Sequence, residues 1–197
     1  MVQMALITDE DTRSSPTVRE TVAAVTRAKL ANALAELALG RLEHLDWDGP
    51  VPAENEVVII VADTLVADPD AIGVALGKPV DELQAAAMLS RLSGRRHKVW
   101  SSTGIITHRS TVPEGWDSEL SHGGWRGALW TESATVEVSE LSDQALLGLV
   151  RSESWRGKAG AYDLAGAMGE FATLVDGAEI CVLGMAAAAI RVLDELL

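Results

Sequence analysis

The sequence contains one cysteine, a minority of basic residues and no long apolar run, and each shortage excludes a class of protein. Cys181 has no second cysteine to pair with, so an internal disulfide is excluded and a reducing compartment is indicated. No apolar stretch approaches the ~20 residues that a transmembrane helix needs. Residues 1–10 lack the basic segment and apolar core of a secretory signal. We therefore expect a cytoplasmic protein that does not span a membrane.

Basic residues are outnumbered, with 16 Lys and Arg against 29 Asp and Glu, and the formal net charge at pH 7 is −13. Binding to a nucleic acid polymer requires a basic surface, so this balance argues against one. The protein can still bind a small anionic substrate if local lysines or arginines and a divalent metal reverse the electrostatic field inside one cleft. Of the 197 residues, 48% are hydrophobic, which is enough for the core of one domain over residues 1–197.

Apolar periodicity divides the chain into strands and helices. The β-branched run at residues 57–61 is typical of a buried strand, and residues 97–107 and 130–138 alternate as strands that pair with each other in antiparallel fashion. Further strands are predicted at 5–7, 171–175 and 178–183. Helices are predicted from Ser15 and Pro16 to Gly40 and at 80–92, 142–150 and 185–197. Segments 43–56 and 108–127 are predicted as loops. The order predicts an α/β protein with a sheet flanked by helices.

Asp63 directly follows the strand predicted at residues 57–61. In open α/β sheets, ligands gather beyond the carboxyl ends of the central strands. A carboxylate at that place is either a general base or metal ligand, or a structural group that accepts hydrogen bonds from backbone N–H groups. The residues alone leave both interpretations open.

Three further charged residues have a simple and a functional interpretation. Lys78 lies between a glycine, which permits close approach, and a proline, which fixes the backbone, so its ammonium can be held over an anion. A lysine in a solvated turn is the simpler interpretation. Glu10 in an acidic loop and Lys29 on the first helix are, by themselves, typical of solvated surface.

The histidines, the cysteine and the tryptophans do not indicate a metal or base-stacking site. His108 and His122 lack the short spacing or the cysteine partners of a zinc site. Cys181 lies in an apolar segment and is expected to be a small buried residue. Four neighbouring tryptophans favour packing or a dimer contact: Trp100, Trp116, Trp125 and Trp130.

Four short stretches nevertheless occur in the order typical of one family. They are VADT at 61–64, GKP at 77–79, LSGRRHKV at 92–99 and GKAGAY at 157–162. From Ala5 to the C-terminus, the chain resembles the Maf (septum formation) nucleotide pyrophosphatases. The resemblance implies a Maf/Ham1-like α/β fold, with a mixed central sheet flanked by helices and a cleft between two lobes.

Proteins of this family cleave nucleoside triphosphates between the α and β phosphates, giving a monophosphate and pyrophosphate, and they need a divalent cation. The Ala-Asp-Thr and Lys-Ala-Gly-Ala-Tyr forms resemble the branch that acts on dTTP and UTP more than the branch that acts on 7-methyl-GTP. The resemblance thus implies a nucleoside triphosphate substrate, with dTTP, UTP or modified pyrimidine nucleotides expected, Mg²⁺ or Mn²⁺ as cofactor, and a homodimer.

The same resemblance assigns roles by position. Asp63 is implied as the base that activates water, directly or through the metal, and Glu10 as a second acidic group at the metal. Lys29 and Lys78 are implied to contact phosphates, and Thr64 to help set base selectivity. In-line attack on a triphosphate needs charge neutralisation and a positioned water, which a carboxylate, a metal and lysines supply.

The sequence also departs from the family pattern. The family's N-terminal strand and its Ser-x-Ser-Pro-Arg-Arg segment, which holds the triphosphate, are not recognised, and insertions are expected at about 39–56 and 113–126. Ala165 stands where a base-selecting glutamine is expected. The absence of the two arginines of that segment would weaken triphosphate binding by several orders of magnitude. We therefore expect either that the true start of the protein lies upstream of Met1 or that the chain is an atypical or inactive member. The alternative function is that of a catalytically impaired relative that binds nucleotide or a protein partner.

Overall fold

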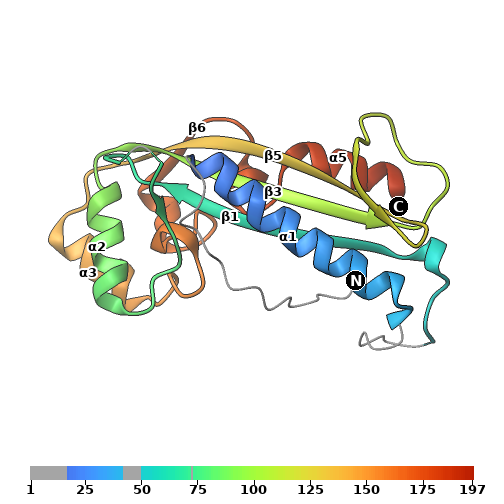
Figure 1. Cartoon of the computed structure of the whole chain (residues 1–197). Helices are drawn as coiled ribbons and strands as arrows, with labels where there is room; N and C mark the ends of the chain where they lie inside the picture. Colours follow the sequence, from blue (N-terminus) through green and yellow to red (C-terminus); the bar gives the residue numbers. More distant parts are fainter. Residues whose placement is uncertain (1–16, 42–49, 72) are drawn as a thin grey trace.

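The computed structural model describes residues 17–41, 50–71 and 73–197. The strands are β1 (Val58–Ala67), β2 (Ala75–Leu76), β3 (Arg96–Thr107), β4 (Ser118–His122), β5 (Trp125–Val138) and β6 (Ala172–Asp176). The helices are α1 (Val18–Ala38), α2 (Glu82–Leu92), α3 (Asp143–Arg151), α4 (Glu179–Val182) and α5 (Ala187–Leu196), with 3₁₀ turns η2 (Glu54–Glu56), η3 (Ala159–Ala161) and η4 (Ala167–Glu170). Figure 1 shows α1 lying along the long strands β1, β3 and β5, with α2 and α3 together at one end.

The described strands form one six-stranded sheet in which every pairing is antiparallel. The order is β2-β1-β3-β5-β4, and β6 pairs with the last residues of β5. Strand β3 pairs with β5 along its whole length, from Arg96 opposite Glu137 to Thr107 opposite Arg126. This confirms both the predicted pairing of the two alternating segments and the central sheet flanked by helices.

Strand β1 is longer than predicted and carries Asp63 in its middle. It continues past Asp63 to Ala67, because Leu65 and Val66 are apolar and become buried in the core. Asp63 lies opposite Ser102 of β3. The argument from the carboxyl end of a strand is therefore wrong for this sheet. On the outer side of β1, β2 pairs only with Val66 and Ala67, and the earlier residues of β1 have no strand partner in the described part of the chain.

Helix α1 covers one face of the sheet at very short range. A Cβ atom on Gly104 of β3 would lie 2.8 Å from Leu30 Cδ1, and one on Gly127 of β5 would lie 3.1 Å from Leu30 Cδ2. Glycine at these two positions lets the helix sit directly on the strands. This approach brings Lys29, the neighbour of Leu30, close to β1.

The other face of the sheet packs against α4 and α5. Ala186, just before α5, is buried, and its N–H donates to Thr103 Oγ1 of β3 at 2.9 Å. At the end of β1, the helices α2 and α3 and the turns η3 and η4 surround Val66 in a hydrophobic cluster that includes Trp155 and Met168. These elements form the scaffold for the loops described below.

Local sequence signals explain where two of the helices begin. Ser142 caps α3, because its Oγ accepts the Ala145 N–H at 3.2 Å. Helix α1 is capped by Thr17, whose Oγ1 accepts the Glu20 N–H at 3.2 Å, so it begins at Val18, later than the predicted start at Ser15 and Pro16. The predicted strand at 5–7 and the residues 42–49 of the predicted connector lie outside the described residues.

Two predicted elements are wrong. Residues 178–183 were expected to form a strand, but residues 179–182 form the single helical turn α4. A short apolar run suits either structure, so periodicity cannot separate them. The predicted loop at 108–127 contains β4, which forms a hairpin with β5 through Gly123 and Gly124, both at positive φ. Strand β5 accordingly begins at Trp125 rather than Trp130.

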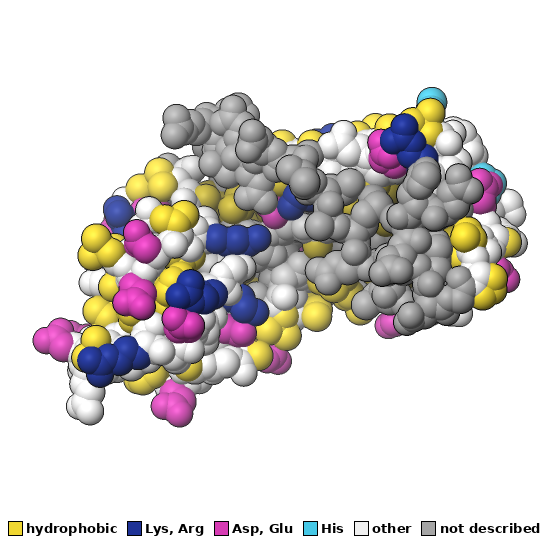
Figure 2. Space-filling view, turned by 90° about the horizontal axis from the view of Figure 1, so that it is seen from below, with side chains coloured by type: hydrophobic (Ala, Val, Ile, Leu, Met, Phe, Trp, Pro, Cys, Tyr) yellow, Lys and Arg dark blue, Asp and Glu magenta, His cyan; other side chains and the backbone are white. Residues whose placement is uncertain are grey.

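The described surface mixes charges of both signs. Figure 2 shows lysine and arginine side chains interspersed with acidic ones at the end of the molecule that carries α2 and α3. None of the described helices is long and apolar enough to cross a membrane.

Candidate active site

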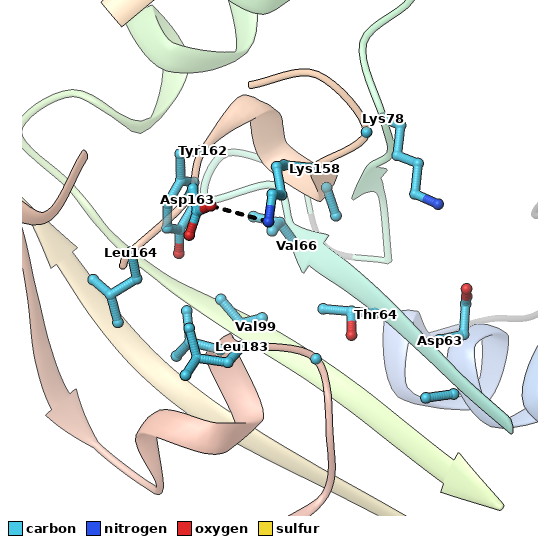
Figure 3. Close-up of a pocket in the computed structure, with 15 residues that line it drawn as sticks. Asp63, Thr64, Val66, Lys78, Val99, Lys158, Tyr162, Asp163, Leu164 and Leu183 are labelled. Carbon is cyan, nitrogen blue, oxygen red and sulfur yellow. Dashed lines mark ion pairs between the residues drawn. The ribbon is translucent and has the colours of Figure 1, made fainter. Parts of the chain in front are cut away.

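A cavity of about 420 Å³ lies beside the outer edge of β1 (Figure 3). Four segments that are distant in the sequence form its walls: β1, the loop after β2, the segment around η3 and the turn after α4. Of the predicted site residues, Asp63, Thr64 and Lys78 line this cavity. Two further charged residues, Lys158 and Asp163, line it as well.

Asp63 forms an ion pair with Lys29 at one end of the cavity. Lys29 Nζ lies 2.8 Å from Asp63 Oδ1 and 3.5 Å from the carbonyl oxygen of Ala62. The side chains of Lys29 and Asp63 are 16% and 9% exposed, so the pair is largely shielded from water. Side chains alternate along a strand, and Val61 and Leu65, on the same face as Asp63, pack against α1. Helix α1 therefore supplies the ammonium that orients this carboxylate.

Thr64 belongs to a chain of hydrogen bonds on the opposite face of β1. Thr64 Oγ1 lies 2.7 Å from Ser101 Oγ, and Ser101 Oγ donates to the carbonyl oxygen of Cys181 at 2.7 Å. A serine hydroxyl has one proton, so Thr64 is the donor to Ser101. The chain ties Thr64 to α4, whose following turn forms one wall of the cavity.

Lys78 is exposed on the loop after β2, and this loop is fastened to the segment around η3. The N–H of Gly160 donates to the carbonyl oxygen of Gly77 at 3.0 Å. Gly160 has φ +66°, and a Cβ atom there would lie 2.8 Å from Val66 Cγ2. Both its backbone conformation and its contact with β1 therefore require glycine at the fourth position of GKAGAY.

An ion pair that the sequence patterns did not indicate lies on this same segment. Lys158 Nζ is 3.0 Å from Asp163 Oδ2, and the side chains are 48% and 25% exposed. Asp163 Oδ1 also accepts the N–H of Ala165 at 3.1 Å. Ala165 thus contributes its backbone, in place of the expected amide side chain. Counting Lys29, the described residues place three lysines and two aspartates at the site.

A buried histidine and tyrosine hold the segment that carries Asp163. His97 Nε2 lies 2.8 Å from Tyr162 Oη, with the rings edge to face. Burial lowers the pKa of His97 to about 4 and raises the pKa of Tyr162, so both side chains are neutral near pH 7. His97 Nδ1 has no hydrogen-bond partner. This contact anchors Tyr162, the neighbour of Asp163, to strand β3.

The described part of the site offers a limited set of metal ligands. No three His, Cys, Asp or Glu side chains among the described residues come together as a metal-binding group. Glu10, the second predicted acidic group, lies outside the described residues. Magnesium is commonly held by one or two carboxylates together with substrate phosphates. Asp63 therefore fits Mg²⁺ that is bound jointly with a polyphosphate.

The other residues considered from the sequence have packing roles. His108 Nε2 lies 3.3 Å from Glu54 Oε2. The His108 ring also packs edge-on against Trp125, with the ring centroids 5.1 Å apart. Trp116 packs edge-on to Trp130. Cys181 is buried, and burial raises the pKa of its thiol. These contacts agree with the predicted structural interpretation.

The comparisons with known proteins identify a family. The model of the family described as Maf-like protein matches residues 2–196. A dTTP/UTP pyrophosphatase of Clostridium acetobutylicum is 31% identical over 157 residues, which cover 79% of this chain and 68% of that protein. A dTTP/UTP pyrophosphatase of Roseobacter denitrificans is 30% identical over 135 residues, 68% of this chain and 62% of that protein.

A human relative shares a smaller part of its length. It is a probable bifunctional dTTP/UTP pyrophosphatase/methyltransferase protein, 36% identical over 127 residues, which cover 64% of this chain and 19% of that protein. The chain thus spans less than two thirds of the human and Roseobacter relatives. The family model, by contrast, matches almost every residue of the chain, and this protein therefore belongs to the Maf family.

Proposed function

We propose that this protein hydrolyses pyrimidine nucleoside triphosphates, dTTP, UTP or modified forms of them, to the monophosphate and pyrophosphate. Family membership and the relatives named dTTP/UTP pyrophosphatases support this substrate class. The observation that carries the proposal is the cavity that Asp63 and Lys78 line, in which the Asp63 carboxylate is held by Lys29. A fixed carboxylate beside ammonium groups is what in-line attack on a polyphosphate needs.

Asp63 acts on the attacking water. The water oxygen forms a bond to the α-phosphorus while the bond from that phosphorus to the α,β-bridging oxygen breaks, and the bonding electrons leave with pyrophosphate. The water proton passes to the Asp63 carboxylate. Lys29, at 2.8 Å, fixes the direction in which this carboxylate points.

The lysines supply positive charge that the chain as a whole lacks. With a formal net charge of −13, the average field of the protein repels a triphosphate. Lys78, exposed on its anchored loop, contacts the β and γ phosphates and stabilises the negative charge of the leaving pyrophosphate. Such charge-assisted hydrogen bonds contribute roughly 1.5–3 kcal/mol each.

A divalent cation belongs to the same proposal. Asp63, with Glu10, would hold Mg²⁺ or Mn²⁺ against the substrate phosphates, and the bound ion would neutralise their charge. Thr64 would contribute to base selectivity. The cavity would form the inner part of the predicted cleft between two lobes, and it supports that prediction. Light scattering tests the separate prediction of a homodimer.

The direct test is pyrophosphate release with Mg²⁺ over a panel of nucleoside triphosphates, using the protein and its Asp63→Asn variant. We expect hydrolysis of UTP and dTTP, and a loss of roughly 10²- to 10⁴-fold in kcat for Asp63→Asn. Asp194→Asn, an exposed change on α5, is the matched control and retains full activity. Equal background in the protein and the Asp63→Asn variant would instead support the alternative, a catalytically impaired relative that binds nucleotide or a protein partner.

A further inference from the structure

The cavity has two chemically different ends. Figure 3 shows Asp63 and Lys78 at one end, and Leu164, Leu183 and Val99 gathered toward the other. A nucleotide has the same division, because its phosphates are charged and the faces of its base are apolar. If the phosphates lie at Asp63, the base lies among the aliphatic side chains.

The Lys158–Asp163 pair borders this aliphatic end (Figure 3). Asp163 is held from two sides, since its Oδ1 accepts the Ala165 N–H at 3.1 Å and its Oδ2 faces Lys158 Nζ at 3.0 Å. The adjacent backbone is also fixed, because the carbonyl oxygen of Asp163 accepts the Gly166 N–H at 3.0 Å. The carboxylate is therefore a positioned acceptor in the cavity wall.

The pair retains capacity to bind a ligand. A carboxylate has about four lone-pair sites, and the two contacts of Asp163 use one on each oxygen. A lysine ammonium has three N–H groups, and the ion pair uses one of them. The wall thus presents an anionic acceptor next to a cationic donor. The complementary ligand edge has an N–H group beside a carbonyl oxygen.

We propose that the Lys158–Asp163 pair recognises the imide edge of uracil or thymine, with Asp163 accepting the base N3–H and Lys158 donating to an adjacent carbonyl oxygen. The inference rests on the proposed function and assigns base selectivity to two residues that were assigned no role from the sequence. Cytosine presents a bare lone pair at N3, which an anionic carboxylate repels. In this chain Asp163, supported by the backbone of Ala165, takes the place of an amide side chain.

A chemical double-mutant cycle tests this contact. UTP and N3-methyl-UTP differ in the single N–H that Asp163 accepts, and each is assayed for binding and for kcat/KM with the protein and its Asp163→Ala variant. We expect methylation to lower kcat/KM roughly 10- to 100-fold in the unchanged protein, the range of one charge-assisted hydrogen bond. In Asp163→Ala the two nucleotides differ by less than about threefold. An equal methylation penalty in both proteins would overturn the inference.

Two further variants guard against misfolding and test the charge. Asp163→Asn keeps an oxygen for the Ala165 N–H, and we expect it to lower the UTP-to-CTP ratio of kcat/KM roughly tenfold or more, with an unchanged melting temperature. Lys158→Gln, which keeps a donor without the charge, has a smaller effect in the same direction. An unchanged ratio in folded Asp163→Asn contradicts the proposal.

The outcomes also separate this inference from the proposed function. Hydrolysis of UTP that ignores Asp163 leaves the pyrophosphatase function intact and overturns only the base contact. No pyrophosphate from any nucleotide overturns the function, and UTP binding by calorimetry then still reports whether Asp163 contacts N3–H.

Discussion

The two ion pairs of the cavity are carried by different kinds of structure, one by regular elements and the other by an irregular segment. Asp63 and Lys29 come from the middle of a strand and of a long helix, and their side chains are 9% and 16% exposed. Asp163 and Lys158 come from one irregular segment, and theirs are 25% and 48% exposed. The comparison indicates that the reacting end is fixed by packing of regular elements. The end that holds Lys158 and Asp163, which we call the recognition end, depends instead on a few local contacts, those of Gly160 and of the His97–Tyr162 pair.

The largest expected difference concerns the two lysines. Lys29→Met breaks the shielded ion pair with Asp63, and we expect a loss of roughly 3–5 kcal/mol in the free energy of unfolding. Lys158→Met removes a solvent-exposed pair and costs less than about 1 kcal/mol. Urea denaturation at pH 7 measures both. Similar losses would break the proposed contrast between the two ends.

The second expected effect is a pH dependence at the recognition end. The pKa of His97 is lowered to about 4 in the folded protein, against 6.5 for the free side chain. Between these values the unfolded chain binds the proton and the folded protein does not, so stability falls as the pH falls from 6.5 to 4. We expect on the order of 3 kcal/mol over this window from His97.

Carboxylates also titrate near the lower end of that window, so the control is His97→Gln. Denaturation curves at several pH values between 7 and 5 should show a steeper loss of stability in the unchanged protein than in this variant. Parallel losses in the two proteins contradict the assignment of a buried neutral histidine.

The smallest expected effect separates two glycines of the recognition end. Gly157 and Gly160 both have positive φ, but a Cβ atom meets nothing within 4 Å at Gly157 and lies 2.8 Å from Val66 Cγ2 at Gly160. Alanine at either position costs about 1–2 kcal/mol for the left-handed backbone. Gly160→Ala should cost roughly 1–3 kcal/mol more for the clash. Equal melting temperatures for the two variants would show that the segment gives way easily.

The sequence was most informative where the chemistry depends on short motifs. Asp63, Thr64 and Lys78 were singled out by their motifs and lie together in one cavity, with Lys29 bonded to Asp63. The rule that ligands gather at the carboxyl end of a strand does not explain the position of Asp63. This residue lies within β1 of an antiparallel sheet and not at a strand end. Glu10 stays a prediction.

Other features have no signal in sequence periodicity. Asp163 and Lys158 are five positions apart in an irregular segment that is turned by left-handed Gly160, and no regular repeat brings them together. The hairpin of β4 turns at Gly123 and Gly124, a local turn signal that the alternation of apolar residues does not contain. The turn α4 is stabilised by a tertiary contact. Ser101 bonds the carbonyl oxygen of Cys181, and this contact holds an apolar run against β3 as a helical turn.

The central claim is that the Asp63 end of the cavity directs water to the α-phosphorus of a pyrimidine nucleoside triphosphate. Hydrolysis of UTP with Mg²⁺ in ¹⁸O-labelled water, followed by mass spectrometry of the products, tests it most directly. The account predicts UMP that carries one label and unlabelled pyrophosphate, with both products lost in Asp63→Asn. Label in pyrophosphate, release of orthophosphate with UDP, or turnover equal to that of Asp63→Asn would contradict it.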